Sequence, residues 1–154
     1  MVLAVGEVAP EFTLSDQHGE ELVLTEMLVD GPVALVFVPF AFSRICTGEF
    51  AELGDELAKF ESHGVRLLGV SVDSVWTLRA WADQEGFDFS ILSDFWPHGE
   101  TARAYGAFVE RTGAAARATV IIDQDRRVAA SFETPVGEPR ALAAYREALA
   151  ALRS

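Results

Sequence analysis

Basic side chains are scarce in this sequence of 154 residues. It holds 12 lysines and arginines against 24 aspartates and glutamates, which gives a formal net charge of −12. A surface of this charge repels nucleic acid, because nucleic-acid binding rests on lysine and arginine neutralising phosphates. It also disfavours anionic membrane surfaces. We therefore expect neither nucleic acid nor a membrane as a partner, and we interpret the acidity as a contribution to solubility.

Long apolar runs and additional cysteines are also absent. No run approaches the roughly 20 residues that span a bilayer, and residues 1–13 lack the basic start of a signal peptide. The single cysteine, Cys46, excludes an intramolecular disulfide, so we expect a cytoplasmic location. The three histidines lie far apart, and neither a Walker A loop nor a G-x-G-x-x-G motif occurs. We expect no metal site and no cofactor.

The apolar segments that are present follow a pattern typical of one α/β domain over residues 1–154. Residues 33–38 form a continuous apolar run, which predicts a strand buried on both faces. Two short strand candidates, 11–14 and 21–24, flank a polar turn and predict an N-terminal β-hairpin. The other predicted strands cover 65–72, 89–92, 119–123 and 128–132, and helices are predicted over 47–62, 75–85 and from Pro139 onward. This order predicts a central sheet covered by helices.

Cys46 lies where the buried strand of residues 33–38 passes into the first predicted helix. Ligand sites in such sheets lie beyond the carboxyl ends of strands. The free N–H groups at a helix N-terminus favour a thiolate, and a thiolate in a cleft is a nucleophile. The alternative is that Cys46 is a small buried apolar residue, as most free cysteines are. The position alone does not decide between the two.

Four other residues are candidates for a site around this sulfur, and each has a simpler interpretation. Ser43 either caps the helix or offers a hydroxyl to a substrate oxygen. Pro39 either stops the strand or shields the sulfur from water. Arg117 is either a solvated residue at a strand start or a cation aimed at the thiolate. Glu49 is either an acid on the helix surface or the residue that orients this arginine.

Residues 39–46 have the pattern P-x-x-x-S-x-x-C, which resembles the P-x-x-x-T/S-x-x-C active-site motif of the peroxiredoxins. The similarity extends along the chain to residues 5–14, 70–74, 92–94, 105–106 and 117–123. Residues 95–99 (FWPHG) and the compact length most resemble the AhpE type, the one-cysteine class typical of actinobacteria. The chain has serine where threonine is commoner in the family, a known alternative that keeps the hydroxyl.

The resemblance implies a thioredoxin-like fold with a central mixed sheet, and a role for each candidate residue. Cys46 becomes the peroxidatic cysteine, Ser43 the hydroxyl that positions peroxide, and Pro39 the shield. Arg117 becomes the arginine that binds thiolate and peroxide, and Glu49 the acid near it. The implied activity is reduction of hydrogen peroxide and organic hydroperoxides through a sulfenic acid at Cys46. The implied partners are a second copy of the chain in a homodimer and an external thiol reductant of mycothiol, mycoredoxin or thioredoxin type.

Two other functions are compatible with a thioredoxin-like fold and one cysteine. The first is a redox sensor or interaction module in which oxidation of Cys46 is a signal without turnover. Sustained turnover with any thiol reductant would exclude it. The second is a thiol-transfer reductase, since residues 43–46 resemble a C-x-x-C motif whose first sulfur is replaced by oxygen. A lone thiol cannot complete that two-electron cycle by itself, so this function is the less favoured.

Overall fold

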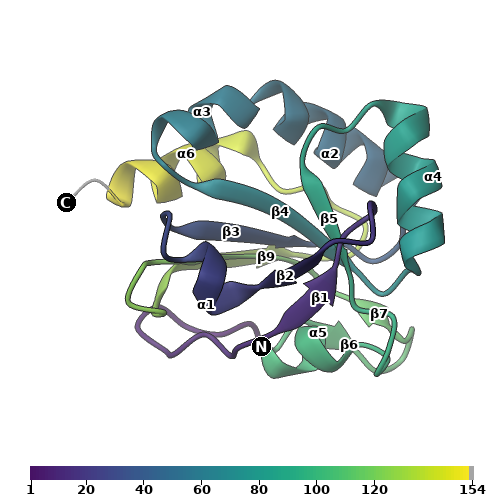
Figure 1. Ribbon diagram of the computed structural model, residues 1–154, viewed down its shortest axis with the longest axis horizontal. Coiled ribbons are helices and arrows are strands. Elements are labelled where there is room, and N and C mark those ends of the chain that lie inside the picture. Colours follow the sequence, from purple (N-terminus) through teal and green to yellow (C-terminus); the bar gives the residue numbers. More distant parts are fainter. Residues whose placement is uncertain (153–154) are drawn as a thin grey trace.

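The computed structural model describes residues 1–152 and contains a seven-stranded mixed sheet with helices on both faces (Figure 1). The strands run in the order β2-β1-β5-β4-β3-β8-β9. They are β1 (Thr13–Ser15), β2 (Glu21–Val23), β3 (Val33–Phe37), β4 (Arg66–Ser71), β5 (Ser90–Ser93), β8 (Arg117–Ile122) and β9 (Val128–Thr134). The helices are α1 (Leu24–Met27), α2 (Arg44–Asp55), α3 (Leu57–Ser62), α4 (Val75–Glu85), α5 (Glu100–Ala104) and α6 (Leu142–Ala151). The predicted α/β class is confirmed.

The sheet divides the core into two layers. On one face, α2, α3, α4 and α6 pack against side chains such as Val36, Leu67 and Ile121. On the other face, α1, α5 and the N-terminal residues cover side chains such as Leu35, Val70 and Val120. All five residues of β3 are fully buried because the strand has neighbours on both edges and helices on both faces. β3 is therefore a rigid support for the loop that follows it.

The pairing of β3 decides which residues come near its carboxyl end. β3 is parallel to β4 and antiparallel to β8, with Val33 opposite Ile122 and Val36 opposite Thr119. In this antiparallel register, the start of β8 lies beside the point where β3 ends. Arg117, the first residue of β8, is therefore brought to the end of β3 that leads into α2.

The predicted helix over residues 47–62 was wrong in its start and its continuity. The chain forms α2 from Arg44 and a separate α3 from Leu57, with Glu56 between them in a non-helical conformation. Cys46 therefore belongs to the first turn of a helix of 12 residues. The N-terminal hairpin is confirmed, since β1 pairs with β2 and joins the edge of the main sheet through β5.

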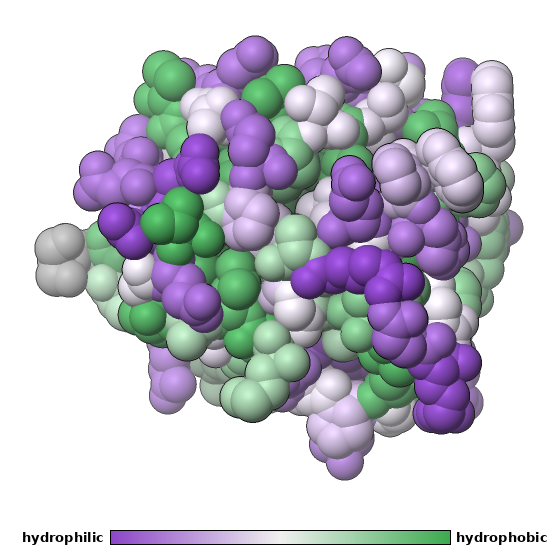
Figure 2. Space-filling model, turned by 90° about the horizontal axis from the view of Figure 1, so that it is seen from below, coloured by the Kyte–Doolittle hydropathy of each residue, from purple (hydrophilic) through white to green (hydrophobic). Residues whose placement is uncertain are grey.

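A small hairpin, β6 (Phe108–Val109) and β7 (Ala114–Ala115), was not predicted from the sequence. It lies beside α5 on the lower side of the molecule in Figure 1. Figure 2 shows the molecule from that side as a mosaic of hydrophilic and hydrophobic residues. None of the helices within residues 1–152 is long and apolar enough to cross a membrane.

Candidate active site

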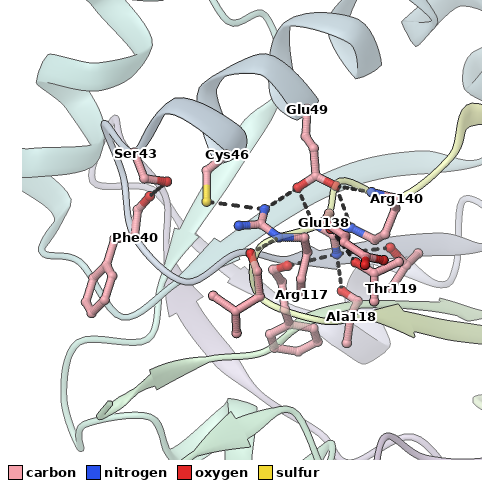
Figure 3. Close-up of polar contacts among 12 residues, drawn as sticks. Phe40, Ser43, Cys46, Glu49, Arg117, Ala118, Thr119, Glu138 and Arg140 are labelled. Carbon is pink, nitrogen blue, oxygen red and sulfur yellow. Dashed lines mark hydrogen bonds and ion pairs between the residues drawn. The ribbon is translucent and has the colours of Figure 1, made fainter.

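Cys46 lies on the buried face of α2, with its side chain inaccessible to solvent. Cys46, Glu49, Phe50 and Leu53 are the buried residues of this helix, at the spacing that places side chains on one face. The sulfur is in the first turn, where unpaired N–H groups give the helix a partial positive charge. The helical periodicity thus directs the thiol and a carboxylate together toward the start of β8 (Figure 3).

Arg117 reaches the sulfur from β8. Its Nη1 lies 3.5 Å from Cys46 Sγ and 2.5 Å from Glu49 Oε1. Its Nε donates a hydrogen bond of 3.0 Å to the carbonyl of Val136, in the segment between β9 and α6. Because side chains alternate along a strand, Arg117 lies on the same face of β8 as Thr119 and Ile121, toward α2 and α6. The arginine is 2% exposed, so the interpretation as a solvated residue was wrong.

Glu49 joins Arg117 to a second buried arginine, Arg140, and we call these three residues the arginine cluster. Glu49 accepts from Arg140 Nη2 at 2.9 Å, from Arg140 Nε at 3.0 Å and from the Arg140 backbone N–H at 2.7 Å. The interpretation of Glu49 as a helix-surface acid was wrong, since it is 4% exposed. Burial raises the pKa of Glu49, but the hydrogen bonds and charge of Arg140 and a hydrogen bond from Arg117 outweigh it, so the pKa is lowered.

Arg140 was not identified from the sequence, although it is the most completely bound member of the cluster. Its Nη1 also donates to the carbonyls of Phe37 and Ala118, at 2.8 and 2.6 Å. These carbonyls belong to β3 and β8, so Arg140 ties the cluster to the centre of the sheet. The one signal available was an arginine beside the apolar stripe of α6 in a chain poor in basic residues.

The cysteine loop (residues 39–43) lies on the side of the sulfur opposite Arg117. Within this loop, the side chain of Ser43 does not have the capping role that the sequence suggested. Ser43 occupies the N-cap position of α2, but its side chain makes no capping hydrogen bond. Its hydroxyl donates instead to the carbonyl of Phe40 at 3.1 Å, as Figure 3 shows. The loop also contains Phe42, whose φ of 67° lies in the left-handed region that side chains other than glycine rarely adopt. Pro39 directly follows the buried end of the strand region.

The structure thus brings Arg117 into contact with both Cys46 and Glu49 and leaves Ser43 bonded within its own loop. A buried thiol beside a fixed guanidinium can be held as a thiolate, and the same guanidinium can bind an oxygen of an incoming substrate. With this site at the carboxyl end of the central strand, the protein is a thioredoxin-fold protein built for thiol chemistry.

Comparison with known proteins shows to which family of thioredoxin-fold proteins the chain belongs. The profile of the family described as AhpC/TSA matches residues 5–131. The chain is 42% identical over 151 residues to alkyl hydroperoxide reductase E of Mycobacterium tuberculosis, covering 98% of this chain and 99% of that protein. The chain belongs to the AhpC/TSA family and is a one-cysteine peroxiredoxin. The predicted similarity to the AhpE type is confirmed.

Solved structures agree with this assignment. The crystal structure of the peroxidoxin BcpB from Mycobacterium tuberculosis is similar with a TM-score of 0.85 and 31% identity, over 98% of this chain and 97% of that one. The AhpC of Mycobacterium tuberculosis is similar with a TM-score of 0.86 over the full length of both chains, at 23% identity. At that identity the likeness concerns the fold, and it confirms the thioredoxin-like architecture.

Proposed function

We propose that residues 1–154 form a single-domain, thiol-dependent peroxidase in which Cys46 attacks hydrogen peroxide and organic hydroperoxides. The observation that carries this proposal is the contact of 3.5 Å between Arg117 and the Cys46 sulfur inside a site of the peroxiredoxin family. The guanidinium and the helix N-terminus both favour the charged sulfur. Arg117 does not move freely, since it is fixed by Glu49 and by the Val136 carbonyl.

In the proposed reaction, the Cys46 thiolate attacks the terminal peroxide oxygen and the O–O bond breaks. Sulfur loses two electrons and becomes a sulfenic acid, while the leaving oxygen takes a proton from solvent and departs as water or an alcohol. Arg117 stabilises the charge that develops on the leaving oxygen. Ser43 binds the peroxide through its hydroxyl after leaving the Phe40 carbonyl, and Pro39, which has no N–H group, keeps water from the sulfur.

Glu49 is proposed as a positioning residue in this reaction. A carboxylate that accepts from two guanidinium groups holds both in fixed orientations. Its contacts restrict Arg117 to a rotamer in which one nitrogen faces the sulfur. The positive charge of two arginines exceeds the negative charge of one glutamate, so the cluster keeps a net positive charge beside Cys46. This charge favours the thiolate.

Reduction of the sulfenic acid requires an external thiol, because the chain has no second cysteine. A first thiol displaces the sulfenic oxygen as water and forms a mixed disulfide, and a second thiol then releases Cys46 as a thiol. We propose mycothiol with a mycoredoxin- or thioredoxin-type partner, supported by the similarity to a mycobacterial alkyl hydroperoxide reductase E. A cytoplasmic location, where such thiols are reduced, is part of the same proposal.

A homodimer is proposed from an aromatic surface beside α4. Trp76, Phe95 and Trp96 are 77%, 51% and 80% exposed. They line a hollow of about 440 Å³ together with residues of β1 and β5. Exposed aromatic clusters of this kind mark interfaces. Sedimentation of Trp96→Glu is expected to show monomers, while Val29→Glu, at another exposed apolar residue, stays dimeric.

The central experiment is stopped-flow oxidation of the reduced protein by hydrogen peroxide and by an organic hydroperoxide, followed by a screen of reducing thiols. The wild type is expected to react far faster than a free thiol and to turn over when a suitable reductant is present. Cys46→Ser is expected to consume no peroxide. A wild-type rate equal to that of a free thiol would overturn the proposed function, and oxidation without turnover would favour the sensor.

A further inference from the structure

Asp73 lies just beyond β4, and its carboxylate reaches across to the cysteine loop. Asp73 Oδ2 accepts a hydrogen bond of 2.7 Å from the backbone N–H of Ala41. The same oxygen accepts from the Ser71 hydroxyl at 2.9 Å, and the Asp73 carbonyl accepts from the Ser93 hydroxyl at 2.6 Å. Asp73 is therefore fixed by the ends of two neighbouring strands, and the bond to Ala41 extends this support to the loop.

This bond is nearly the whole polar attachment of the cysteine loop. Among residues 1–152, it is the one hydrogen bond that joins residues 39–42 to another element. The other ties are apolar, and one of them is the ring of Phe42, which lies 6.3 Å from that of Trp81 on α4. Phe40 and Phe42 are 43% and 45% exposed, so the burial that holds the loop comes mainly from Pro39, which is buried, and from Ala41, which packs against the core. Within residues 1–152, Asp73 is thus the side chain that ties residues 39–42 to another element by a hydrogen bond.

The loop covers a sulfur that has to be reached by two different molecules. Cys46 is fully buried while the loop is in place. A peroxide is small and reacts best when Pro39 and Ser43 are held beside the sulfur. Because the sulfur has no exposed surface, both molecules need an opening beside it. A reducing thiol, which brings a larger atom and the rest of its molecule up to the sulfenic acid, needs a wider opening than hydrogen peroxide does. Reduction therefore requires the loop to move away.

We propose that Asp73 is a positioning residue that latches the cysteine loop, holding it closed for peroxide reduction and setting how often it opens to a reducing thiol. This inference rests on the proposed function, because it divides the two half-reactions of that catalytic cycle. The bond between Asp73 and the loop has opposite effects on the rates of the two half-reactions. A weaker latch slows oxidation, since Pro39 and Ser43 leave the sulfur, and it speeds reduction, since the sulfenic acid is exposed for a larger share of the time.

The test compares Asp73→Ala and Asp73→Asn with the wild type in each half-reaction separately. Losing a hydrogen bond to a charged acceptor shifts an opening equilibrium by roughly tenfold or more. For Asp73→Ala the closed loop remains the major state, so we expect oxidation by hydrogen peroxide to be slower by only about twofold. Capture of the sulfenic acid by dimedone, and its reduction by 2-mercaptoethanol, should each be about tenfold faster. Asp73→Asn keeps a neutral acceptor and should show the same two signs with smaller changes.

Ser74→Ala is the matched control. Ser74 Oγ accepts from the Thr77 N–H at the start of α4, so this variant weakens the helix next to Asp73 and leaves the bond to Ala41 in place. Both of its half-reactions are expected to match the wild type. If circular dichroism shows that Asp73→Ala is not folded, the same measurements on Asp73→Asn provide the test.

Two results would overturn the latch: half-reactions that change in the same direction, or half-reactions that stay unchanged in folded Asp73 variants. Failure of the proposed function looks different. In that case the wild type itself does not react with peroxide faster than a free thiol. An active wild type with unaltered Asp73 variants therefore removes the latch and leaves the peroxidase.

Discussion

On one side of the Cys46 sulfur stand three charged side chains that are almost completely buried, and on the other side lies a loop with two half-exposed phenylalanines. In the arginine cluster, Glu49 receives four hydrogen bonds from Arg117 and Arg140 within residues 1–152. The cysteine loop has one hydrogen bond from residues 39–42 to another element in the same part of the chain.

The two sides differ because the sulfur needs both a fixed electrostatic environment and a cover that can move. Charges inside a protein are costly unless every one is paired, so the cluster has to be complete and rigid. No buried side-chain nitrogen or oxygen within residues 1–152 lacks a hydrogen-bond partner. The loop carries no buried charge, and the rings of Phe40 and Phe42 already face water, so opening it costs less than disrupting the cluster. The same sulfur can thus keep a fixed electrostatic environment while its cover moves.

Replacing Arg140, the most completely hydrogen-bonded member of the arginine cluster, is expected to have the largest effect, and that effect is on stability. Arg140→Met leaves Glu49 with one cation and removes the donor from two sheet carbonyls. Removing one partner of a buried ion pair costs about 3–5 kcal/mol, and we expect a loss of this size in the free energy of unfolding measured with urea. Arg146→Met is the control, because Arg146 pairs with Glu56 while itself 54% exposed and its loss should not move the urea midpoint. Equal shifts in the two variants would contradict the comparison.

Changing Arg117 to lysine separates charge from geometry within the cluster. A lysine keeps the positive charge, but its ammonium group lacks the planar fork that serves Glu49, the Val136 carbonyl and the sulfur together. Loss of a preorganised donor typically costs 10²–10³-fold in rate, and we expect about 100-fold slower oxidation by hydrogen peroxide in stopped-flow measurements. Arg103→Lys, at an exposed pair with Glu110, should react like the wild type. A loss below about threefold for Arg117→Lys would mean that charge alone suffices.

The lowered pKa of Glu49 makes the cluster sensitive to acid. A carboxyl whose pKa is lower in the folded than in the unfolded protein stabilises the fold at neutral pH. That contribution is lost as the pH falls below the ordinary value of 4.5 and through the lowered pKa. Urea unfolding across this range should show a steeper decline in stability for the wild type than for Glu49→Gln, which cannot titrate. Parallel pH profiles for the two proteins would show that Glu49 is not held as described.

The fold could be predicted from the sequence because its signals are local. The apolar run of β3 and the N-terminal hairpin turn each lie within a few residues, and the predicted elements there agree with the structure. The approach of Arg117 to Cys46 was proposed from the family motif, and its physical cause is the antiparallel register of β8. Periodicity alone cannot reveal that register.

The missed features depend on contacts between distant parts of the chain. Arg140 is 91 residues from Glu49 and lay in the first turn of the helix predicted from Pro139, whereas the structure begins α6 at Leu142. The burial of Glu49 had a weaker local signal, since Cys46, Phe50 and Leu53 form one helical stripe that begins earlier than the predicted helix. The left-handed conformation of Phe42 had no signal, because phenylalanine rarely adopts it and the loop is shaped by its attachments.

The smallest expected effect is a change in the free energy of unfolding when Phe42, in the cysteine loop, is replaced. A non-glycine residue in the left-handed region costs roughly 1–2 kcal/mol. Phe42→Gly relieves this strain while losing the contact with Trp81, and we expect its free energy of unfolding to stay within about 1 kcal/mol of the wild type. Phe42→Ala loses the same contact and keeps the strain, so it should be the less stable of the two. Urea unfolding of both variants measures the difference.

This ranking reverses the usual one, in which glycine is less stable than alanine by about 0.5–1 kcal/mol. The usual ranking should hold at Ala58, an exposed residue in α3, where Ala58→Gly is expected to destabilise by a similar amount. If alanine proves at least as stable as glycine at position 42, the loop carries no strain and its mobility must arise from its few attachments alone. If glycine is the more stable, the strain at Phe42 opposes the bond to Asp73, and the closed loop rests on a balance between the two.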